Sequence, residues 1–495
     1  MTEKQNSLPD WFDEVPREKS YRSIFKFGDP KIFHHPSPKM VQAMIKRLNL
    51  PDEQFKQKVS TGNEVIDFEF STGIDQVHVQ AFQEMVGSKN VSTETFERIK
   101  FSTGQAAEEA LRLRDHQVDY VTDLVLHPRT KEEIAEIVAY CNQHLIPVYV
   151  YGGGSSVTLG LRPAKGGVTV VLSTHLNKII ELNELNQTVT VQAGILGPDL
   201  EEALNDAPRR FGSQHAYTCG HFPQSFLHSS VGGWFVTLGS GQQSTYYGDA
   251  VDLVLAVEVV TPVGTIRTWD FPASACGPNV MEFAFAYSGF SGSLIDQLIT
   301  LLGFKPDQRC LCLATADGDK SFTRNVQRRM KSICKKRGAF YLGGSPAKIW
   351  EKGRFTVAER EDLMDYGVLI DTLETSVKWD NLHEIHQKVR AYIKNRPDTM
   401  CATHASHFYP QGTNLYFIYS FVGTNIEEYL EFQQGIIDTI VESGGTPSHH
   451  HGIGRLASPV IETYLGKENM DVLKALKRYF DPNNIMNPGG VLGIS

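Results

Sequence analysis

The chain has 495 residues, of which 41% are hydrophobic, 10% aromatic and 21% charged. This composition excludes a largely disordered chain, a collagen and a coiled coil, and the length predicts two to four domains. The net charge of −9 provides no global basic field that would recruit nucleic acid. The chain has no apolar run of membrane-spanning length, no signal-peptide core and no peroxisomal signal at Gly493-Ile494-Ser495, so we expect a cytoplasmic protein.

The first 115 residues form a predicted helical region. Apolar side chains recur at helical spacing over residues 40–48 and again over residues 106–113. The early part also carries aromatic residues among charges, namely Trp11, Phe12, Phe25, Phe27 and Phe33. Packing onto the rest of the chain is the favoured role for this region, and dimerisation or contact with a membrane surface are the alternatives.

From about residue 118 the pattern changes to short strands and tight turns. A strand over 120–126, a helix over 131–144 and a strand over 146–151 together predict one α/β unit. Two hairpins follow, formed by 179–182 with 188–191 and by 253–260 with 265–268, and a helix begins near Gly197. The block over 309–443 alternates strands and helices, and the last helix ends at Asp481-Pro482. Seven scattered cysteines without a Cys-x-x-Cys pair predict reduced, mostly buried thiols.

The predicted strand over 146–151 runs directly into the glycine loop Gly152–Ser156. Backbone amides approach an oxyanion closely only where side chains are missing, so this loop could hold a phosphate. It is not a mononucleotide loop, because Ser156-Val157-Thr158 replaces Gly-Lys-Ser/Thr. It is not the dinucleotide fingerprint either, because Pro163 arrives before a long helix can form. Taken alone, the loop is slightly better explained as a glycine turn that binds nothing.

Two further stretches of small residues, Ser229–Gly233 and Ser288–Ser293, also lie near predicted strands. Close packing of strands would explain either of them separately. Three such stretches in one α/β region instead favour a long ligand that passes several loops, as a dinucleotide does.

These residues carry a family resemblance. The pattern Tyr151-Gly152-Gly153-Gly154-Ser155-Ser156, then Gly220-His221-x-Pro223-x-Ser225, Ser229-Ser230-Val231-Gly232-Gly233-Trp234 and Ser448-His449-His450-His451-Gly452 resembles the vanillyl-alcohol-oxidase (PCMH-type FAD-binding) flavoproteins. Within that superfamily, the chain is most similar to the alkyldihydroxyacetonephosphate synthases. The resemblance covers roughly residues 115–495.

The resemblance implies an α+β fold. Its expected parts are the N-terminal helical region 1–115, a PCMH-type FAD-binding domain over 116–305, an α/β cap or substrate domain over 306–445, and a C-terminal FAD-linked oxidase segment over 446–495 beside the flavin. It also implies non-covalent FAD, because no histidine follows the glycine loop where some relatives attach flavin. The implied cofactor-binding residues are Val150, Tyr151, Gly152, Gly153, Gly154, Ser155, Ser156, Gln224, Ser225, Phe226, Leu227, His228, Ser229, Ser230, Thr237, Leu238, Gly239, Ser240, Gly289, Phe290, Ser291, Gly292, Ser293, Leu294 and Ile295.

The resemblance further implies a reaction of ether lipid synthesis. The acyl group of acyl-dihydroxyacetone phosphate is exchanged for a fatty alcohol through a flavin N5 adduct, without net redox change. Tyr416 falls where the family has its catalytic tyrosine, and His449, His450 and His451 match a histidine cluster that could move a proton near working pH. Arg360 matches an arginine that grips substrate phosphate. Without the resemblance, Tyr416 is an ordinary strand aromatic and Arg360, flanked by acids, a solvated ion-pair residue.

Three positions depart from the family pattern. Ala273 and Leu238 stand where the family has arginines, and Ser291 stands where it has a glutamate. Losing a cation beside the flavin removes charge stabilisation that an adduct would use. FAD binding therefore tolerates these departures better than synthase activity does.

Two other functions stay open. One is a FAD-linked oxidase or dehydrogenase of a 2-hydroxy acid or alcohol, which the same fold would support. The other is a catalytically degenerate homologue that binds FAD structurally or not at all. A metal site is not expected, although His404, His407 and His449–His451 could supply imidazoles, because no acidic ligand stands at a recognisable spacing. The expected partner is a small or lipid-like substrate and not nucleic acid, and both a homodimer and a peripheral membrane contact are compatible with the resemblance.

Overall fold

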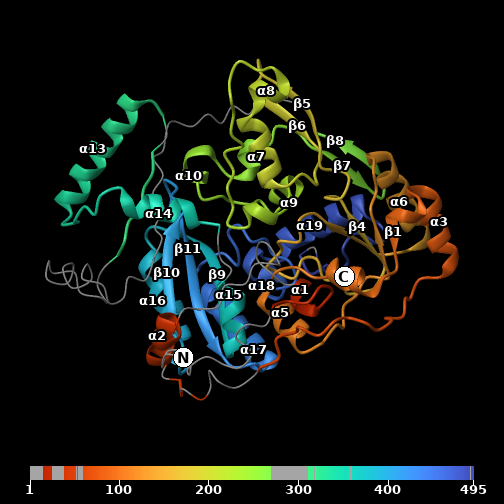
Figure 1. The fold of residues 1–495 in the computed structure, drawn as a ribbon, viewed down its shortest axis with the longest axis horizontal. Helices are drawn as coiled ribbons and strands as arrows, with labels where there is room; N and C mark the ends of the chain where they lie inside the picture. The colour runs from red at the N-terminus through yellow and green to blue at the C-terminus, as the bar shows by residue number, and fades with distance from the viewer. Residues whose placement is uncertain are drawn as a thin grey trace.

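A computed structural model describes residues 15–24, 38–48, 50–51, 53, 59–268, 310–316, 318–355, 359–490 and 492–494. The fold is α+β, as predicted, with two main sheets that lie in different parts of the molecule (Figure 1). Several residues named above lie outside the described residues, and these are Trp11, Phe12, Phe25, Phe27, Phe33, Ala273, Ser288 and the whole predicted cofactor loop Gly289–Ile295.

The first sheet has four strands in the order β1 (Val91–Ser92), β2 (Leu124–Leu126), β4 (Val168–Val171) and β3 (Val148–Tyr151). Strands β2, β4 and β3 are parallel, and β1 pairs antiparallel with β2. Helices α3 (Gln76–Val86) and α6 (Lys131–His144) share an apolar core with this sheet.

The predicted helix over 131–144 is confirmed, but the predicted strands flanking it are too long. Strand β3 begins only at Val148, after Pro147, which has no N–H group to donate to a neighbouring strand. Strand β2 begins only at Leu124, because the preceding Asp123 carboxylate accepts the N–H groups of Gly73 and Gly167 at 2.6 Å each.

Two hairpins and several short helices follow the first sheet. The predicted hairpin of β5 (Ile179–Asn183) and β6 (Thr188–Val191) is confirmed, as is a helix at Gly197. The strand predicted from residue 253 is wrong at its start, since residues 250–253 form α11 and β7 begins at 258. The elements of this part are α7 (Gly197–Asn205), α8 (Ala207–Phe211), η3 (Phe226–His228), α9 (Val231–Val236), α10 (Ser244–Tyr247), α11 (Ala250–Leu253), β7 (Glu258–Thr261) and β8 (Gly264–Arg267).

The second sheet is antiparallel, in the order β10 (Cys401–Ser406), β11 (Gly412–Val422) and β9 (Val368–Lys378). Helices α16 (Leu382–Asn395) and α17 (Ile426–Glu442) pack against it. Side chains alternate between the two faces of a strand. Leu415 and Phe417 therefore enter the core with the helices, and Tyr416 between them faces the other way.

The described part of the N-terminal region packs onto the rest of the chain, whereas the five aromatic residues for which packing was favoured lie outside the described residues. Residues of α1 (Tyr21–Ile24) and α5 (Ala107–Arg114) belong to the core of the second sheet. The buried carboxylate of Asp365 accepts hydrogen bonds from Arg22 and Arg114, at 2.7 Å from an oxygen to each Nη1. The remaining helices are α2 (Pro38–Leu48), η2 (Ser88–Asn90), α4 (Thr95–Lys100), α13 (Lys320–Lys336), α14 (Ser345–Gly353), α15 (Glu359–Asp362), η4 (Leu363–Tyr366), α18 (Ser458–Leu465) and α19 (Lys467–Phe480).

The C-terminal residues return to the first sheet. Met486 forms a parallel bridge with Val148 of β3, and the N–H groups of Arg455 and Leu456 donate to the carbonyl of Thr158, just after the glycine loop. Of the six described cysteines, all are free thiols but only Cys141 is buried, so the prediction of mostly buried thiols is wrong. Among the described residues, no helix is long and apolar enough to cross a membrane.

Candidate active site

The glycine loop Gly152–Ser156 lies directly against the segment 228–230. A Cβ atom at Gly153 would overlap the carbonyl oxygen of His228, and one at Gly152 would overlap the hydroxyl of Ser230. That hydroxyl caps α9 by accepting the N–H of Gly233 at 3.3 Å. The two loops can pack this closely only because residues 152 and 153 have no side chain.

The same loop presents backbone donors that have no partners in the described part of the chain. No described residue accepts a hydrogen bond from the N–H groups of Gly152–Ser156. Consecutive unpaired amides at the carboxyl end of a parallel strand form a concavity suited to an anion. These residues therefore fit the pyrophosphate of FAD.

The other predicted cofactor residues lie in different surroundings. Ser229 accepts the indole N–H of Trp234 at 2.7 Å, which fixes the segment that crosses the glycine loop. The side chain of Gln224 donates to the carbonyl of Arg354 at 2.6 Å, so it is engaged by protein. Leu238 has a positive φ of 53° and is 57% exposed. Thr237 lies against Gly452 and thus connects this region with the histidine segment.

Tyr416 lies in the middle of a row across the second sheet. The register pairs it with His404 of β10 on one side and with Glu374 of β9 on the other. The rings of His404 and Tyr416 are stacked, with centroids 4.7 Å apart, and His450 and His451 lie beyond Tyr416 at 6.2 and 5.5 Å. The structure therefore brings together the tyrosine and histidines that the sequence analysis singled out.

The phenol of Tyr416 is a hydrogen-bond donor. Its hydroxyl donates to Thr372 Oγ1 at 3.0 Å. Burial raises the pKa of Tyr416 to about 12, so the group is a neutral phenol at pH 7. It is thus suited to giving a proton or hydrogen bond to a developing anion, and not to acting as a preformed base.

Glu374 holds the histidine segment in place. Its carboxylate accepts the hydroxyl of Ser448 at 2.8 Å and the backbone N–H groups of the three histidines at 2.8–3.1 Å. Burial alone would raise its pKa, but the imidazoles of His450, His451 and His449, which are cationic when protonated in acid, and the hydrogen bond from Ser448 hold the pKa well below its usual range. The carboxylate is therefore ionised, and it fixes the backbone from which the imidazoles project.

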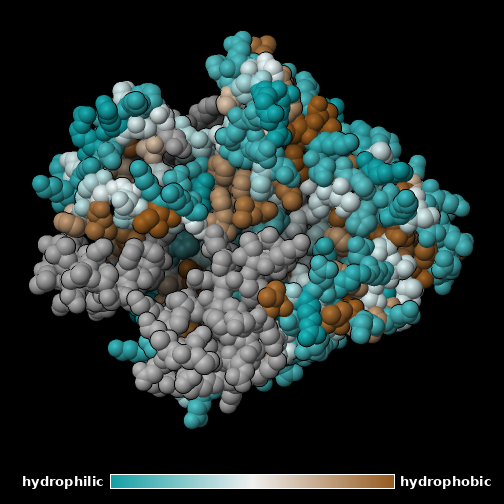
Figure 2. All heavy atoms as spheres, viewed as in Figure 1, coloured by the Kyte–Doolittle hydropathy of each residue, from teal (hydrophilic) through white to brown (hydrophobic). Residues whose placement is uncertain are grey.

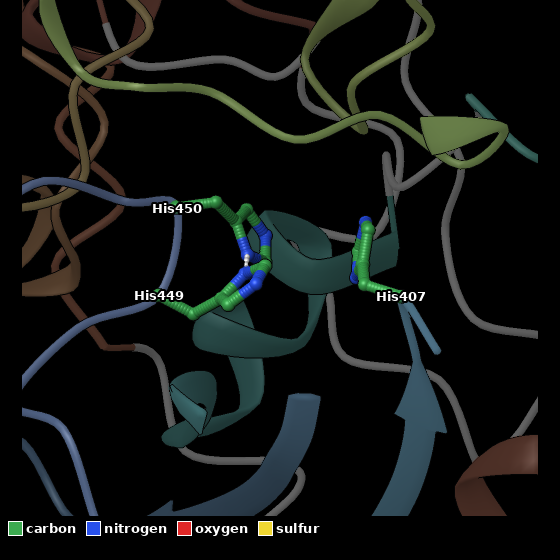
Figure 3. Close-up of side chains that lie close together, drawn as sticks. All are labelled: His407, His449 and His450. Atoms are coloured by element: carbon green, nitrogen blue, oxygen red, sulfur yellow. Dashed lines mark hydrogen bonds between the residues drawn. The ribbon is translucent and has the colours of Figure 1, made fainter. Parts of the chain in front are cut away.

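Three imidazoles, His407, His449 and His450, meet beside this row (Figure 3), with ligand nitrogens within 4.8 Å of one another. Hydrogen bonds engage both nitrogens of His407, to Ser406 Oγ at 2.8 Å and to the carbonyl of Gly241 at 3.0 Å. The Nδ1 atoms of His449 and His450 lie 2.9 Å apart. This network accounts for the close approach of the rings, and the expectation of no metal stays a prediction.

A relay from another segment sets the protonation of His449. The hydroxyl of Tyr409 donates to Asp249 Oδ2 at 3.0 Å and lies 2.9 Å from His449 Nε2. Because that hydroxyl has one proton, His449 Nε2 must be the donor to it. In the neutral tautomer of His449, Nδ1 is then an acceptor, His450 donates from Nδ1, and the Nε2 lone pair of His450 is available, with no partner among the described residues.

Four of these imidazoles, those of His404, His407, His450 and His451, are neutral at pH 7. Burial lowers the pKa of His450 well below its ordinary value and also lowers the pKa of His451, although Glu374 opposes both shifts. Burial lowers the pKa of His404 and of His407 to about 4. The expectation that this cluster titrates near working pH is therefore corrected for His450 and His451, which lie ready as proton acceptors.

Asp371 of strand β9 forms an ion pair with Arg360 and holds it beside the site. The Nε atom of Arg360 donates to the carbonyl of Ile370 at 2.8 Å. The side chain is only 14% exposed, so the alternative of a solvated helix ion pair is wrong. A ligand phosphate would have to share this guanidinium with Asp371.

His221 belongs to the site by its surroundings, although the sequence analysis gave it no role. It is 1% exposed, its ring lies 4.8 Å from that of Trp234, and neither ring nitrogen has a hydrogen-bond partner among the described residues. Buried polar groups usually find partners, so this imidazole is suited to facing a bound ligand. The sequence signal that could have identified His221 as a site residue is its position inside the pattern Gly220-His221-x-Pro223-x-Ser225.

Two family models match adjoining parts of the chain. The first, a FAD binding domain, matches residues 122–270, and the second, the C-terminal domain of FAD linked oxidases, matches residues 268–491. Together they cover strands β2, β4 and β3 of the first sheet, the whole second sheet and the histidine segment.

Individual relatives agree with these models. The chain is 26% identical to an alkyldihydroxyacetonephosphate synthase of Dictyostelium discoideum over 93% of this chain and 88% of the relative. It is 25% identical to glycolate oxidase subunit GlcD of Bacillus subtilis over 75% of this chain and 89% of the relative. A solved alkyldihydroxyacetonephosphate synthase superposes with a TM-score of 0.74 at 20% identity, covering 96% of this chain and 99% of that one. A solved p-cresol methylhydroxylase has a similar fold. It superposes with a TM-score of 0.58 at 14% identity, covering 86% of this chain and 98% of that one.

Proposed function

Since the chain belongs to the PCMH-type FAD-binding flavoproteins, as an alkyldihydroxyacetonephosphate synthase-like enzyme, we propose that it exchanges the acyl group of acyl-dihydroxyacetone phosphate for a fatty alcohol. The observation that carries the proposal is the row of Tyr416 with its neighbours facing the histidine segment. A neutral phenol and neutral imidazoles meet there, which suits a reaction that moves protons without net redox change.

The bound flavin supplies the carrier for the three-carbon unit while one substituent leaves and the next enters. The carbon–oxygen bond to the fatty acid breaks, and the acid leaves as a carboxylate that Tyr416 can stabilise by hydrogen bonding. The fatty alcohol forms the new carbon–oxygen bond and loses its proton, for which the Nε2 lone pair of His450 is the acceptor. His451 is the second neutral imidazole close to Tyr416.

Arg360 is the proposed phosphate-binding residue. It lies close enough to His451 and Tyr416 to influence the pKa of each. The pairing with Asp371 limits its free charge, and Leu238 provides none where the family has a second arginine. We therefore expect weak phosphate binding, seen as a high KM.

A second candidate function is a FAD-linked oxidase or dehydrogenase acting on a 2-hydroxy acid or alcohol. The specific observation in its favour is the neutral imidazole of His450, which would serve equally as a base beside a C–H bond. The partly neutralised Arg360 suits a small carboxylate as well as a phosphate. The degenerate homologue is the remaining alternative, and a flavin-free protein would establish it.

The deciding experiment is anaerobic addition of acyl-dihydroxyacetone phosphate and fatty alcohol to the purified yellow protein. We expect a change in flavin absorbance with release of fatty acid and no consumption of an electron acceptor. Reduction of an acceptor dye by glycolate or lactate, with no fatty acid released, would move the function to the oxidoreductase. Tyr416→Phe is the matched variant, since it removes one hydroxyl and leaves the stacked ring.

The proposal includes dissociable FAD, a cytoplasmic location and a homodimer. Residues 157–162, after the glycine loop, contain no histidine or cysteine. Acid precipitation should therefore release all flavin into the supernatant, and flavin that stays with the pellet would contradict non-covalent binding. Light scattering and cell fractionation test the oligomer and the location.

A further inference from the structure

Helix α13 projects from the body of the protein on the side of the second sheet, with α14 at its base (Figure 1). Figure 2 shows mostly hydrophilic surface over α13 and hydrophobic residues next to it around α14. No part of the candidate active site lies on this helix, so its surface is available for another role.

The projection has a charge opposite to that of the rest of the chain. Residues 318–350 contain nine of the 48 Lys and Arg residues but only one of the 57 Asp and Glu residues. The segment therefore carries +8 and the remaining chain −17. The single acid, Asp319, is occupied as the N-cap of α13, where it accepts the N–H groups of Ser321 and Phe322 at 2.7 and 3.0 Å.

The cations of α13 have no anionic partners in the described part of the chain. None of its seven Lys and Arg side chains forms an ion pair there, and Lys331 instead lies 4.0 Å from the centre of the Tyr341 ring. Seven like charges on one helix repel each other, so the arrangement costs stability unless something outside the chain neutralises them.

Large apolar side chains are exposed on the same projection. Ile333 of α13 is 54% exposed, and the consecutive residues Phe340, Tyr341 and Leu342 are 40–53% exposed. In contrast, Val326 of α13 is buried, so this side chain packs inward while the others point outward. A basic helix with aromatic and aliphatic residues beside the cations is typical of segments that lie on an anionic bilayer.

We propose that α13 and residues 337–344 dock onto an anionic phospholipid surface, with the cations against headgroups and Phe340–Leu342 inserted at the interface. Each Lys or Arg near such a surface contributes about 1 kcal/mol, so the cations on one side of α13 are enough for reversible binding. The exposed apolar residues favour a bilayer over nucleic acid, which would neutralise the cations but leave the three apolar residues in water. The inference rests on charge and exposure and is independent of the proposed reaction.

The test is flotation of the full-length flavoprotein with vesicles of phosphatidylcholine alone or mixed with phosphatidylserine. We expect binding only to the mixed vesicles, and release by high salt as surface charges are screened. Absence of binding to the mixed vesicles, or equal binding to both kinds, would overturn the proposal. A short DNA duplex that displaces the protein from vesicles at low concentration would overturn it in favour of nucleic acid.

Matched variants locate the surface. Arg328→Glu/Arg329→Glu should lower vesicle binding roughly thirty-fold, whereas Lys46→Glu/Arg47→Glu, the same change on the exposed end of α2, should leave it nearly unchanged. Equal loss in both variants would show a general charge effect and contradict docking through α13. Flavin content and thermal unfolding confirm folding, and activity on detergent-dispersed substrate should be unchanged by R328E/R329E whichever reaction the enzyme catalyses.

Discussion

The glycine-loop region and the second-sheet region form their parts of the site in different ways. Around Gly152–Ser156 the chemistry comes from backbone amides, and side chains matter chiefly where they are missing. Around Tyr416 it comes from titratable side chains held in fixed protonation states by Glu374 and by the relay through Tyr409. A backbone site is disrupted by adding atoms, whereas a side-chain site is disrupted by removing them. Mutations can therefore separate cofactor binding from catalysis.

The largest expected effect is the loss of turnover in Tyr416→Phe. The ring stays stacked on His404, and the hydroxyl that donates to Thr372 is lost. We expect kcat to fall roughly 10²–10⁴-fold, the range for removal of a positioned acid–base group, with flavin content unchanged. Steady-state kinetics and the visible spectrum measure both quantities. A fall in flavin content that matches the fall in kcat would mean that the two regions are not separable.

The next effect is on cofactor retention, and two neighbouring glycines provide the comparison. Gly153→Ala places a methyl group against the backbone carbonyl of His228, which cannot rotate away. In Gly152→Ala the obstacle is the Ser230 hydroxyl, the end of a side chain. We expect Gly153→Ala to cost about 3 kcal/mol or more and to lose bound flavin, and Gly152→Ala to lose less. The ratio of flavin to protein after gel filtration and the free energy of unfolding in denaturant rank the two variants. A larger loss in Gly152→Ala than in Gly153→Ala would contradict the packing argument.

Glu374→Gln should disturb the histidine segment and leave the glycine loop intact. Glutamine retains the shape, but its N–H₂ group faces donors that the carboxylate accepts. We expect a loss of about 1–3 kcal/mol in the free energy of unfolding and a larger fall in kcat than in flavin affinity. Urea unfolding and flavin titration test this. An unchanged kcat would remove Glu374 from the positioning of the imidazoles.

Acid should destabilise the second-sheet region through its buried imidazoles. Burial lowers the pKa of His404 to about 4 from an ordinary 6.5, so the unfolded chain binds the proton more tightly. This contribution to stability is present above pH 6.5 and is lost as the pH falls toward 4. Between pH 7 and 5 it amounts to about 2 kcal/mol for one such histidine. His404→Phe keeps a ring beside Tyr416 and should reduce the loss, which unfolding curves at the two pH values would measure.

Much of the local structure could be predicted from the sequence. The helix Lys131–His144 has an N-cap threonine and acids in its first turn, and its limits were predicted correctly. The limits of the strands were predicted less accurately. Strand β3 starts after Pro147 and strand β2 starts after Asp123, whose carboxylate accepts hydrogen bonds from Gly73 and Gly167, and an apolar pattern does not reveal such effects. The site residues that were missed, among them His221, Glu374 and Asp249, are polar side chains whose importance comes from what lies next to them in space.

The sequence by itself determined the glycine loop after a strand, because the loop follows from local pattern. The α+β class and the candidate roles of Tyr416 and the histidine run came from the resemblance that the motifs carry. Only the tertiary structure decided that Tyr416, Glu374 and the histidines share one site, since the register of β9, β10 and β11 sets that row. It also decided which groups are charged. The protonation states of Glu374 and the imidazoles depend on burial and on hydrogen bonds between segments far apart in the chain, and no local pattern encodes these.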